Sequence, residues 1–291
     1  MARRSFPDSR LVSLDGLDFE LVWEGAAKHV DCLCALRDEV LQLAAEVRGW
    51  TDAESLSFFR RHFKIEPLYE ANALLLIYQD DALVGLAGSV NDWNFGRSAI
   101  VHLCTLGLKP AVQMRGLLDL AGALLWLATL RQEHVRESLA EGRLFTTAIT
   151  QSPYIMAYMR RFADIVPSPS RATPAADEIE AARHVVARFD AHIPLDEERL
   201  VLRNECRFRY RRLPLSRDRA LNRFCLRELR YDEGDVFVVV GRVAPEKLER
   251  FVAGQNAANQ RRLGQLWQAL MGADMLPFAL SQAEAQEWAM T

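Results

Sequence analysis

The sequence predicts an α/β fold, a mixed and mostly antiparallel sheet flanked by helices. Strand patterns and helix patterns alternate along the first half of the chain. Two apolar runs, residues 73–78 and 82–90, are separated by only three polar residues, which is typical of a β-hairpin. With 291 residues, 50% of them apolar, the chain can bury a full core without disulfide bonds or a structural metal.

The N-terminal part predicts one strand and two helices. Residues 19–23 have a short strand pattern, and residues 29–47 place apolar side chains at helical spacing. Thr51 and Glu54 have the spacing of a capping box, with Thr51 as the expected N-cap of the second helix.

The central part predicts a third strand and a long helix after the hairpin. Turn-forming residues 91–96 lead to a strand pattern at 99–108, which Pro110 ends. Residues 112–136 are apolar almost all round, as in a helix that is covered on several faces. The predicted order up to this point is β-α-α-β-β-β-α.

One more strand and one more helix complete this first part. Residues 144–150 are rich in β-branched side chains, as strands are. Ser152 and Pro153 are then expected at the N-cap and the first position of a helix that runs to residue 162.

A proline-rich loop divides the chain into two parts. Residues 166–174 contain three prolines, which exclude regular structure there. We therefore expect a first unit over residues 1–165 and a C-terminal α/β extension over residues 166–291. The extension has a helix pattern at 177–189, a strong strand pattern at 235–243 and helical patterns after it. We expect that strand to complete the first sheet or to belong to a second one.

Composition excludes several functional classes. A formal net charge of −3 argues against a dedicated nucleic-acid binder. Five cysteines without a CxxC pair are typical of reduced thiols, and no secretory signal is recognised, so we expect a cytoplasmic protein. The most apolar stretch, residues 117–130, is shorter than the ~20 residues of a membrane span. No histidine, cysteine or acidic cluster has metal-ligand spacing, and we expect no metal.

The loop before the apolar helix has the features of an anion site. Arg115 and Gly116 lie between the strand pattern and the helix pattern. Backbone N–H groups at a helix N-terminus bind phosphate oxygens, and glycine permits their close approach. An ordinary strand-to-helix turn is the alternative, because one glycine is weak evidence of a phosphate site.

Element order and this loop together resemble the GNAT superfamily of acyl-CoA-dependent N-acyltransferases, over about residues 17–162. The family's pyrophosphate loop has the pattern Q/R-x-x-G-x-G/A. Residues 113–118 match it at Gln113 and Gly116 but have Leu118 in place of a small residue. The resemblance implies that CoA is bound by Gln113, Met114, Arg115, Gly116, Leu117 and Leu118. Because Leu118 narrows the approach of the pyrophosphate, acyl carrier protein is an alternative donor.

The resemblance also implies how the rest of the donor is held. In the family, the strand before the loop separates from the next strand, and the pantetheine arm pairs with it like an added β-strand. Leu106, Gly107 and Leu108 would supply these main-chain groups. A tyrosine about two turns into the following helix protonates the leaving thiolate, and Tyr158 fits this place to within one position. A packing role is the alternative for Tyr158.

His102 is the candidate base. It lies eleven residues before Gln113, the spacing at which histone-type members of the family place a carboxylate base. An imidazole with an ordinary pKa near ~6.5 can deprotonate an ammonium at neutral pH. A hydrogen-bonded core histidine is the alternative. Nearby Cys104 is expected to be a buried, inert thiol rather than the site of an acyl-enzyme.

An arginine-rich segment spans residues 199–230, with eleven arginines against three acidic residues. The CoA 3′-phosphate, an acidic carrier protein or an acidic peptide would be attracted to such a segment. A solvated face paired with acidic residues elsewhere in the chain is the alternative.

The expected function is transfer of an acyl group from a CoA or carrier-protein thioester to a primary amine, by direct attack in a ternary complex. The acceptor is a small molecule or a peptide, and acetyl-CoA or another acyl-CoA is the co-substrate. Two alternatives remain: a long-chain N-acyltransferase that uses acyl carrier protein, and a catalytically degenerate binding or regulatory module. Apolar residues near the C-terminus are expected to cover a pocket or to form a homodimer interface; they are Phe251, Leu263, Leu266, Trp267 and Leu270.

Overall fold

The strands and helices of the chain are seen in a computed structural model. It describes residues 6–7, 9–23, 29–63, 68, 70–113, 115–171, 173–206, 209–254 and 257–271. The strands are β1 (Arg10–Leu14), β2 (Leu17–Val22), β3 (Ala73–Gln79), β4 (Ala82–Phe95), β5 (Ser98–Leu108), β6 (Leu144–Thr150), β7 (Ala163–Val166), β8 (Leu195–Asp196), β9 (Val201–Leu202) and β10 (Val236–Val243). The helices are α1 (Val30–Val47), α2 (Ala53–His62), α4 (Leu117–Thr129), α5 (Glu133–Ala140), α6 (Pro153–Met159), α7 (Ala176–Phe189), α8 (Arg219–Glu228), α9 (Pro245–Ala253) and α10 (Ala257–Met271).

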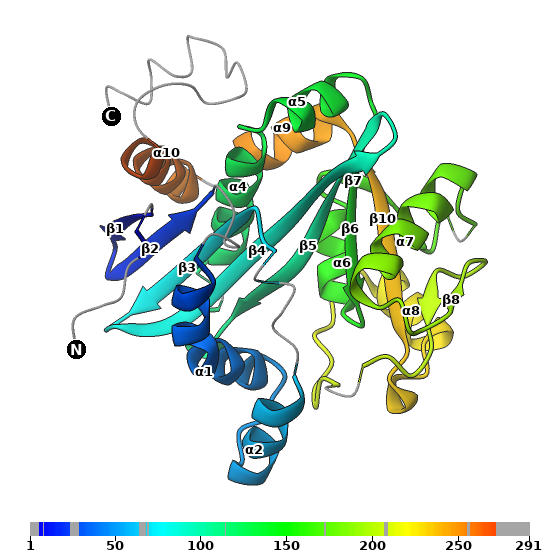
Figure 1. Cartoon of the computed structure of the whole chain (residues 1–291), viewed down its shortest axis with the longest axis horizontal. Coiled ribbons are helices and arrows are strands. Elements are labelled where there is room, and N and C mark those ends of the chain that lie inside the picture. Colours follow the sequence, from blue (N-terminus) through cyan, green and yellow to red (C-terminus); the bar gives the residue numbers. More distant parts are fainter. Residues whose placement is uncertain are drawn as a thin grey trace.

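These strands form one sheet in the order β1-β2-β3-β4-β5-β6-β10-β9-β8, and β7 pairs with β10 outside this path (Figure 1). Among the described strands, only β5 and β6 pair in parallel. The predicted fold, a mixed and mostly antiparallel sheet flanked by helices, is therefore confirmed.

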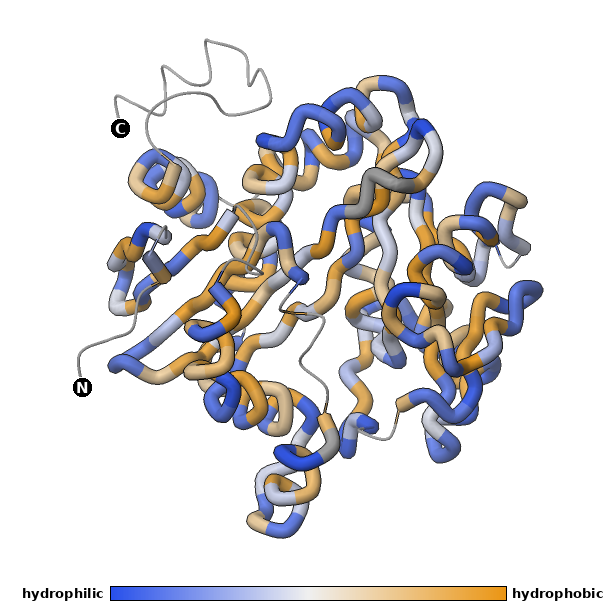
Figure 2. The backbone as a smooth tube through the Cα atoms, in the orientation of Figure 1, coloured by the Kyte–Doolittle hydropathy of each residue, from blue (hydrophilic) through white to orange (hydrophobic). Residues whose placement is uncertain are grey.

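Helices cover both faces of the sheet. The side chains of each strand point alternately to the two faces and form two apolar layers with these helices. In β3, Leu75 and Ile77 belong to one layer, which also contains side chains of α4, α6, α8, α9 and α10. Leu74 and Leu76 belong to the opposite layer under α1 and α2. A third cluster lies between α7 and the strands β6 and β10. Figure 2 shows the resulting hydrophobic colouring along the central strands.

Two local predictions need correction, and one strand was not predicted. The expected helix over residues 112–136 is divided into a 3-10 turn at Pro110–Val112, then α4 and α5. Asp52, rather than Thr51, is the N-cap of α2, because its carboxylate accepts a hydrogen bond from the Ser55 backbone N–H at 2.8 Å. Strand β1 was not expected; it is a short edge strand whose side chains are mostly exposed, so it has no alternating apolar pattern.

The C-terminal part of the chain completes the first sheet. β10 pairs antiparallel with β6, from Phe237 opposite Thr150 to Arg242 opposite Phe145. This outcome confirms the first of the two expectations for the strand pattern at 235–243. Helix α10 packs on β1 and α4, and its apolar side chains are buried in the chain's own core.

The described residues contain no helix that is both long and apolar enough to cross a membrane. They also contain no cluster of three or more histidine, cysteine or acidic side chains suited to a metal ion.

Candidate functional site

The strands β5 and β6 are paired at one end and separated at the other (Figure 1). Their parallel pairing runs from Ala99 opposite Leu144 to His102 opposite Thr147. Beyond His102, β5 remains paired with β4 as far as Leu108, but no described strand pairs with its other edge. An unpaired strand edge presents free N–H and C=O groups. The separated half of β5 is thus an internal edge that can accept an added strand.

Two adjoining cavities occupy this opening. The inner cavity, of about 130 Å³, lies between α1 and the separated strands. The outer cavity, of about 420 Å³, extends from the end of β5 to the N-terminal ends of α4 and α6. Both are lined by the same five residues at their junction, which are Val47, Leu106, Gly107, Ile155 and Tyr210. Together they form one channel along the free edge of β5.

The outer end of the channel is the loop that leads into α4. Gly116 is the N-cap residue of α4 and has a φ of 72°, which favours glycine. Its carbonyl accepts a hydrogen bond from Asn259 Nδ2 of α10 at 3.0 Å, and a Cβ on Gly116 would lie 2.8 Å from that nitrogen. Gln113 Nε2 donates to the carbonyl of Leu108 at 2.9 Å and joins the loop to the end of β5. The loop is therefore held from two sides.

Most of the residues predicted to bind the donor do line the outer cavity. They are Leu106, Gly107, Leu108, Gln113, Gly116, Leu117 and Leu118. Arg115 is exposed and is not part of the cavity lining. Met114 lies outside the described residues. The bulky Leu118 side chain is half-buried at the cavity wall, where the family pattern has a small residue.

Tyr158 does not line the channel. Its side chain is 5% exposed and its ring meets the rings of Phe162 and Phe251 edge-on. A Cβ on Gly122 of α4 would lie 1.5 Å from the Tyr158 hydroxyl oxygen, so the tyrosine occupies the space that this glycine leaves. Burial raises the pKa of Tyr158 far above its usual value, and the charge of Asp119 adds to this effect. This position fits the packing alternative.

Tyr154 is the tyrosine that α6 presents to the outer cavity. It lies on the same helix face as Tyr158 but one turn closer to the helix N-terminus, beyond the cover of α4. Its side chain is 44% exposed, and burial of the rest raises the pKa of the phenol, as does the charge of Asp119. Asp119 is itself paired with Arg161. Tyr154 is therefore a protonated O–H group at neutral pH, within the channel.

His102 is sealed in the paired half of β5. It is 6% exposed, its Nδ1 lies 2.9 Å from Thr147 Oγ1, and its ring stacks on Phe189 at the end of α7. Burial lowers the pKa of His102 to about 3, and the positive charge of Arg188 contributes in the same direction. His102 is not among the residues that line either cavity. This geometry fits the alternative of a hydrogen-bonded core histidine.

Cys104 lines the inner cavity, where burial raises the pKa of its thiol to about 12. The nucleophilic form of cysteine is the thiolate. A thiol with this pKa remains protonated at neutral pH, in agreement with the expected inert role.

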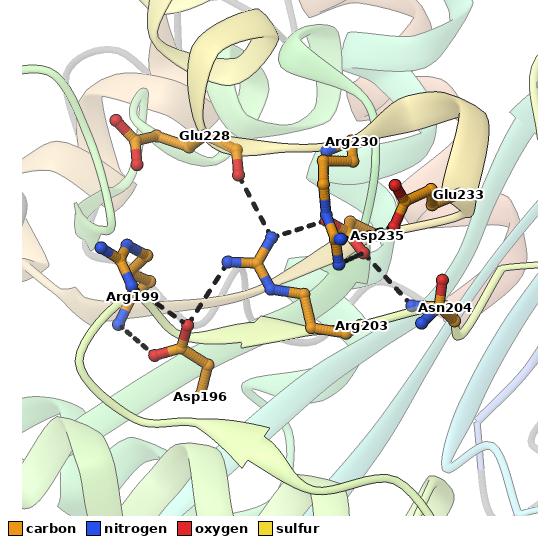
Figure 3. Close-up of polar contacts among 8 residues, drawn as sticks. All are labelled: Asp196, Arg199, Arg203, Asn204, Glu228, Arg230, Glu233 and Asp235. Carbon is orange, nitrogen blue, oxygen red and sulfur yellow. Dashed lines mark hydrogen bonds and ion pairs between the residues drawn. The ribbon is translucent and has the colours of Figure 1, made fainter.

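Among the described residues, five of the eleven arginines in the arginine-rich segment form ion pairs with acidic side chains; they are Arg199, Arg203, Arg211, Arg227 and Arg230. Asp235 is fully buried and accepts hydrogen bonds from Arg203 Nη1 at 2.6 Å, Arg230 Nε at 3.0 Å and the Asn204 backbone N–H at 3.2 Å (Figure 3). Burial raises the pKa of Asp235, but the bonds from Arg230 and Arg203 outweigh it and leave this pKa below its usual value. Arg227 pairs with Glu228. These contacts fit the alternative of a paired, solvated face.

Part of this segment forms a wall of the channel. Tyr210 lines both cavities, and Pro214 and Leu215 line the outer one. The segment is attached to the α1–α2 side by a hydrogen bond from Trp50 Nε1 to the carbonyl of Arg209, at 2.7 Å. On the other side, the Tyr154 backbone N–H donates to the carbonyl of Pro214 at 3.3 Å. We call residues 209–215 the strap, because they span the mouth of the channel between α1 and α6.

Comparisons with known proteins give weak likenesses. No model of a known protein family matches the chain, and no curated protein sequence matches it. Among solved structures, a diaminobutyrate acetyltransferase from Paenibacillus lautus, in complex with its substrate and coenzyme A, is 12% identical, with a TM-score of 0.29 over 50% of this chain and 72% of that one. A PaiA N-acetyltransferase from Thermoplasma acidophilum, in complex with coenzyme A, is 14% identical, with a TM-score of 0.31 over 50% and 90%.

A third match covers more of this chain. The loading GNATL domain of CurA from Lyngbya majuscula is 10% identical, with a TM-score of 0.31 over 77% of this chain and 97% of that one. All three descriptions are of acetyltransferases or a GNAT-like domain, the family that the sequence resembles. Because these TM-scores and identities are low, the proposals below rest on the geometry of the chain itself.

Proposed function

We propose that the chain transfers a short acyl group from a CoA thioester to an amine. One observation carries the proposal: the free edge of β5 faces a continuous channel that ends at the glycine N-cap of α4. A helix N-terminus stabilises phosphate, and an unpaired strand edge can bind an extended amide chain as an added strand. CoA has both groups, with the pantetheine arm following the pyrophosphate.

The donor fits the channel in one direction. The pyrophosphate would bind at Gly116 and the N-terminus of α4, and the pantetheine amides would pair with main-chain groups of residues 103–108. The thioester follows these amides and then lies where the junction of the two cavities opens into the inner cavity. A backbone N–H there would bind the thioester oxygen and stabilise the negative charge that develops on it.

In the acyl transfer, Tyr154 and water donate and accept the protons that the reaction requires. The amine nitrogen attacks the thioester carbon from the inner cavity, the new C–N bond forms and the C–S bond breaks. The thiolate accepts a proton from the Tyr154 hydroxyl, which is the O–H group that we place beside the leaving sulfur. Neither a carboxylate nor a histidine is among the described residues that line the inner cavity. The ammonium proton is therefore released to water, and solvent restores the proton of Tyr154.

The size of the inner cavity supports a short acyl group over a long one. Its volume of about 130 Å³ is comparable with the ~150 Å³ of an engineered protein cavity that binds benzene. The acceptor shares this volume with the acyl group, so the space left for the acyl group is that of a short chain such as acetyl. Leu118 also narrows the outer cavity without closing it. We therefore favour an acyl-CoA donor over a long-chain acyl carrier protein.

Two measurements on the purified chain test this function. Isothermal titration with acetyl-CoA is expected to show micromolar binding, and release of free thiol with a panel of primary amines is expected to show turnover. Desulfo-CoA should bind without turnover. Binding without turnover for every amine would favour the regulatory alternative. Binding only after addition of an acyl carrier protein would favour the carrier-dependent alternative.

A further inference from the structure

The inner cavity has one charged residue in its described lining, Arg48. This residue is the C-cap of α1, and its side chain is half-buried. The rest of the lining is dominated by apolar side chains such as Val40, Leu43, Leu68 and Leu86. A single cation in an apolar cavity can bind a ligand group of negative charge.

The guanidinium of Arg48 is held in place by two aromatic rings. Its Cζ atom lies 5.1 Å from the centre of the Phe63 ring and 5.4 Å from the centre of the Tyr210 ring. Phe63 follows α2 and Tyr210 belongs to the strap, so both walls of the cavity contact the same side chain. The guanidinium therefore has a fixed position before any ligand binds.

Among the described residues, the Arg48 side chain has one hydrogen-bond acceptor. An arginine side chain has five N–H donors, and Nη1 donates to the carbonyl of Ala44 in α1 at 3.1 Å. Within the described part of the chain, no carboxylate forms an ion pair with Arg48. Nearby Arg211 provides the contrast, because its guanidinium also stacks on an aromatic ring, that of Trp50, yet pairs with Asp52 at 2.8 Å. Of these two arginines, Arg211 has a carboxylate partner and Arg48 has none among the described residues.

A ligand carboxylate would complete this arrangement. A guanidinium that is partly removed from water gains most from a carboxylate, which it binds with two parallel hydrogen bonds. The apolar lining favours an apolar group next to that carboxylate, and the cavity volume limits the group to about the size of one ring. The chemistry that fits the inner cavity is an apolar group that carries a carboxylate.

We propose that the acceptor is an amino acid with an apolar side chain, whose carboxylate binds Arg48 in the inner cavity. This inference rests on the proposed function, because that function places the acceptor amine at the junction of the cavities. The same chemistry has a second source, a carboxylate at the far end of the acyl group. Separate arms of the test distinguish the two sources.

The first arm varies the acceptor at constant acetyl-CoA. L-Phenylalanine is compared with its amide and with phenethylamine, and L-leucine with its amide and with isoamylamine. We expect kcat/KM for the amino acids to exceed that for the amides by about 10- to 100-fold, the effect of one charge-assisted pair. The amide has the less basic amine and would react faster if the carboxylate were not recognised. Equal or faster reaction of the amides in the wild-type chain would overturn the proposal.

Variants of Arg48 connect this preference to the cavity. Arg48→Gln should lose the preference for the amino acid while its affinity for acetyl-CoA stays within about 2-fold, and Arg48→Lys should retain part of it, because the charge remains without the planar pair of donors. Arg227→Gln, which removes an exposed arginine outside the channel, is the matched control. Thermal unfolding of each variant separates loss of recognition from loss of folding.

The second arm varies the acyl group at constant phenethylamine. Succinyl-CoA and butyryl-CoA have acyl chains of similar length, and only the first ends in a carboxylate. If succinyl-CoA were preferred and the preference disappeared in Arg48→Gln, the carboxylate would belong to the donor and the acceptor proposal would be wrong.

The proposed function and this inference fail in different ways. If acetyl-CoA does not bind to the wild-type chain, the proposed function fails. Binding of phenylalanine and of phenylalaninamide to the chain alone, followed by saturation-transfer NMR, then decides the inference. Binding of the acid that Arg48→Gln abolishes would support a carboxylate site, and equal binding of both compounds would overturn it.

Discussion

The two halves of β5 differ although they belong to one strand. Residues 100–102 are paired on both edges, and the side chain of His102 is buried under α7. Residues 103–108 are paired with β4 alone and face the channel with their other edge. The closed half contains a titratable side chain that solvent does not reach, whereas the open half offers main-chain groups that a ligand can reach.

Under the proposed function, the chemistry belongs to the open half. In the open half, the strand itself supplies hydrogen-bonding groups, and the channel adds the phenols of Tyr154 and Tyr210 and the guanidinium of Arg48. Such a site depends on where its strands separate rather than on a cluster of ionisable residues.

The network around Asp235 anchors the segment that contains the strap at both ends, because Arg203 and Asn204 precede the strap and Arg230 follows it. Asp235→Ala would leave Arg203 and Arg230 without their buried partner. These arginines are partly exposed, so we expect a loss of about 3 kcal/mol in the free energy of unfolding, the lower end of the range for breaking a buried pair. Urea denaturation measures this loss. The matched control is Asp164→Ala, an exposed partner of Lys247, and a loss as large in the control would contradict the account.

The glycine at the outer end of the channel is the second target. Gly116→Glu places a side chain against Asn259, at a positive φ, and adds a negative charge at the helix N-terminus. We expect the affinity for acetyl-CoA to fall by about 100-fold or more, which is about 3 kcal/mol. Isothermal titration gives this affinity. Gly142→Glu is the control, since Gly142 also has a positive φ but open space around it; an equal loss there would point to strain alone.

Tyr154 and Tyr158 both belong to α6, but Tyr154 lines the channel and Tyr158 is buried in the core. Tyr154→Phe is expected to lower kcat by about 100-fold, the lower end of the usual contribution of a general acid, without changing the affinity for acetyl-CoA. Tyr158→Phe should leave kcat within about 2-fold, because its hydroxyl lies against Gly122 rather than in the channel. Steady-state kinetics of both variants, at saturating amine, measure the effect. The opposite ranking would restore Tyr158 as the general acid.

We expect His102, in the paired half of β5, to make the stability of the chain depend on pH. The pKa of His102 is lowered to about 3 in the folded chain, against 6.5 as its ordinary value. Between these values the unfolded chain binds a proton that the folded chain does not, so the free energy of unfolding falls as the pH falls through this window. His102→Gln should reduce that slope by up to one proton, about 1.4 kcal/mol per pH unit. Urea denaturation at several pH values measures the slope.

The same variant tests whether His102 acts as a base. With the imidazole sealed away from the channel, the pH dependence of kcat/KM should keep its shape in His102→Gln. A new inflection in that profile, with an unchanged slope of stability, would show that His102 exchanges protons with the substrate.

Local signals predicted much of the fold and one end of the site. The sequence predicted the hairpin of β3 and β4, the strand β5 and the glycine at 116. Apolar periodicity, turn residues and glycine determine the structure of the few residues around them, so such features can be recognised locally. The same local reasoning joined α4 and α5 into one helix, since both are amphipathic or apolar and the short break between them has no proline.

The chemical roles of side chains were harder to predict, because they depend on distant parts of the chain. Tyr154 and Tyr158 share a helix face, and only the cover of α4 decides which of them meets the channel. His102 is sealed because β6 stays paired up to Thr147 and α7 lies over it. Arg48 gave no local signal, since its aromatic contact Tyr210 comes from the arginine-rich segment far along the chain.

Amide hydrogen exchange with and without CoA would show whether the ligand pairs with the free edge of β5. If the pantetheine arm pairs with the free edge of β5, CoA should slow exchange of amides in residues 103–108 and leave residues 100–102 unchanged. The paired half serves as the internal reference within the same strand. Binding of CoA that leaves residues 103–108 as exposed to exchange as before would contradict the account.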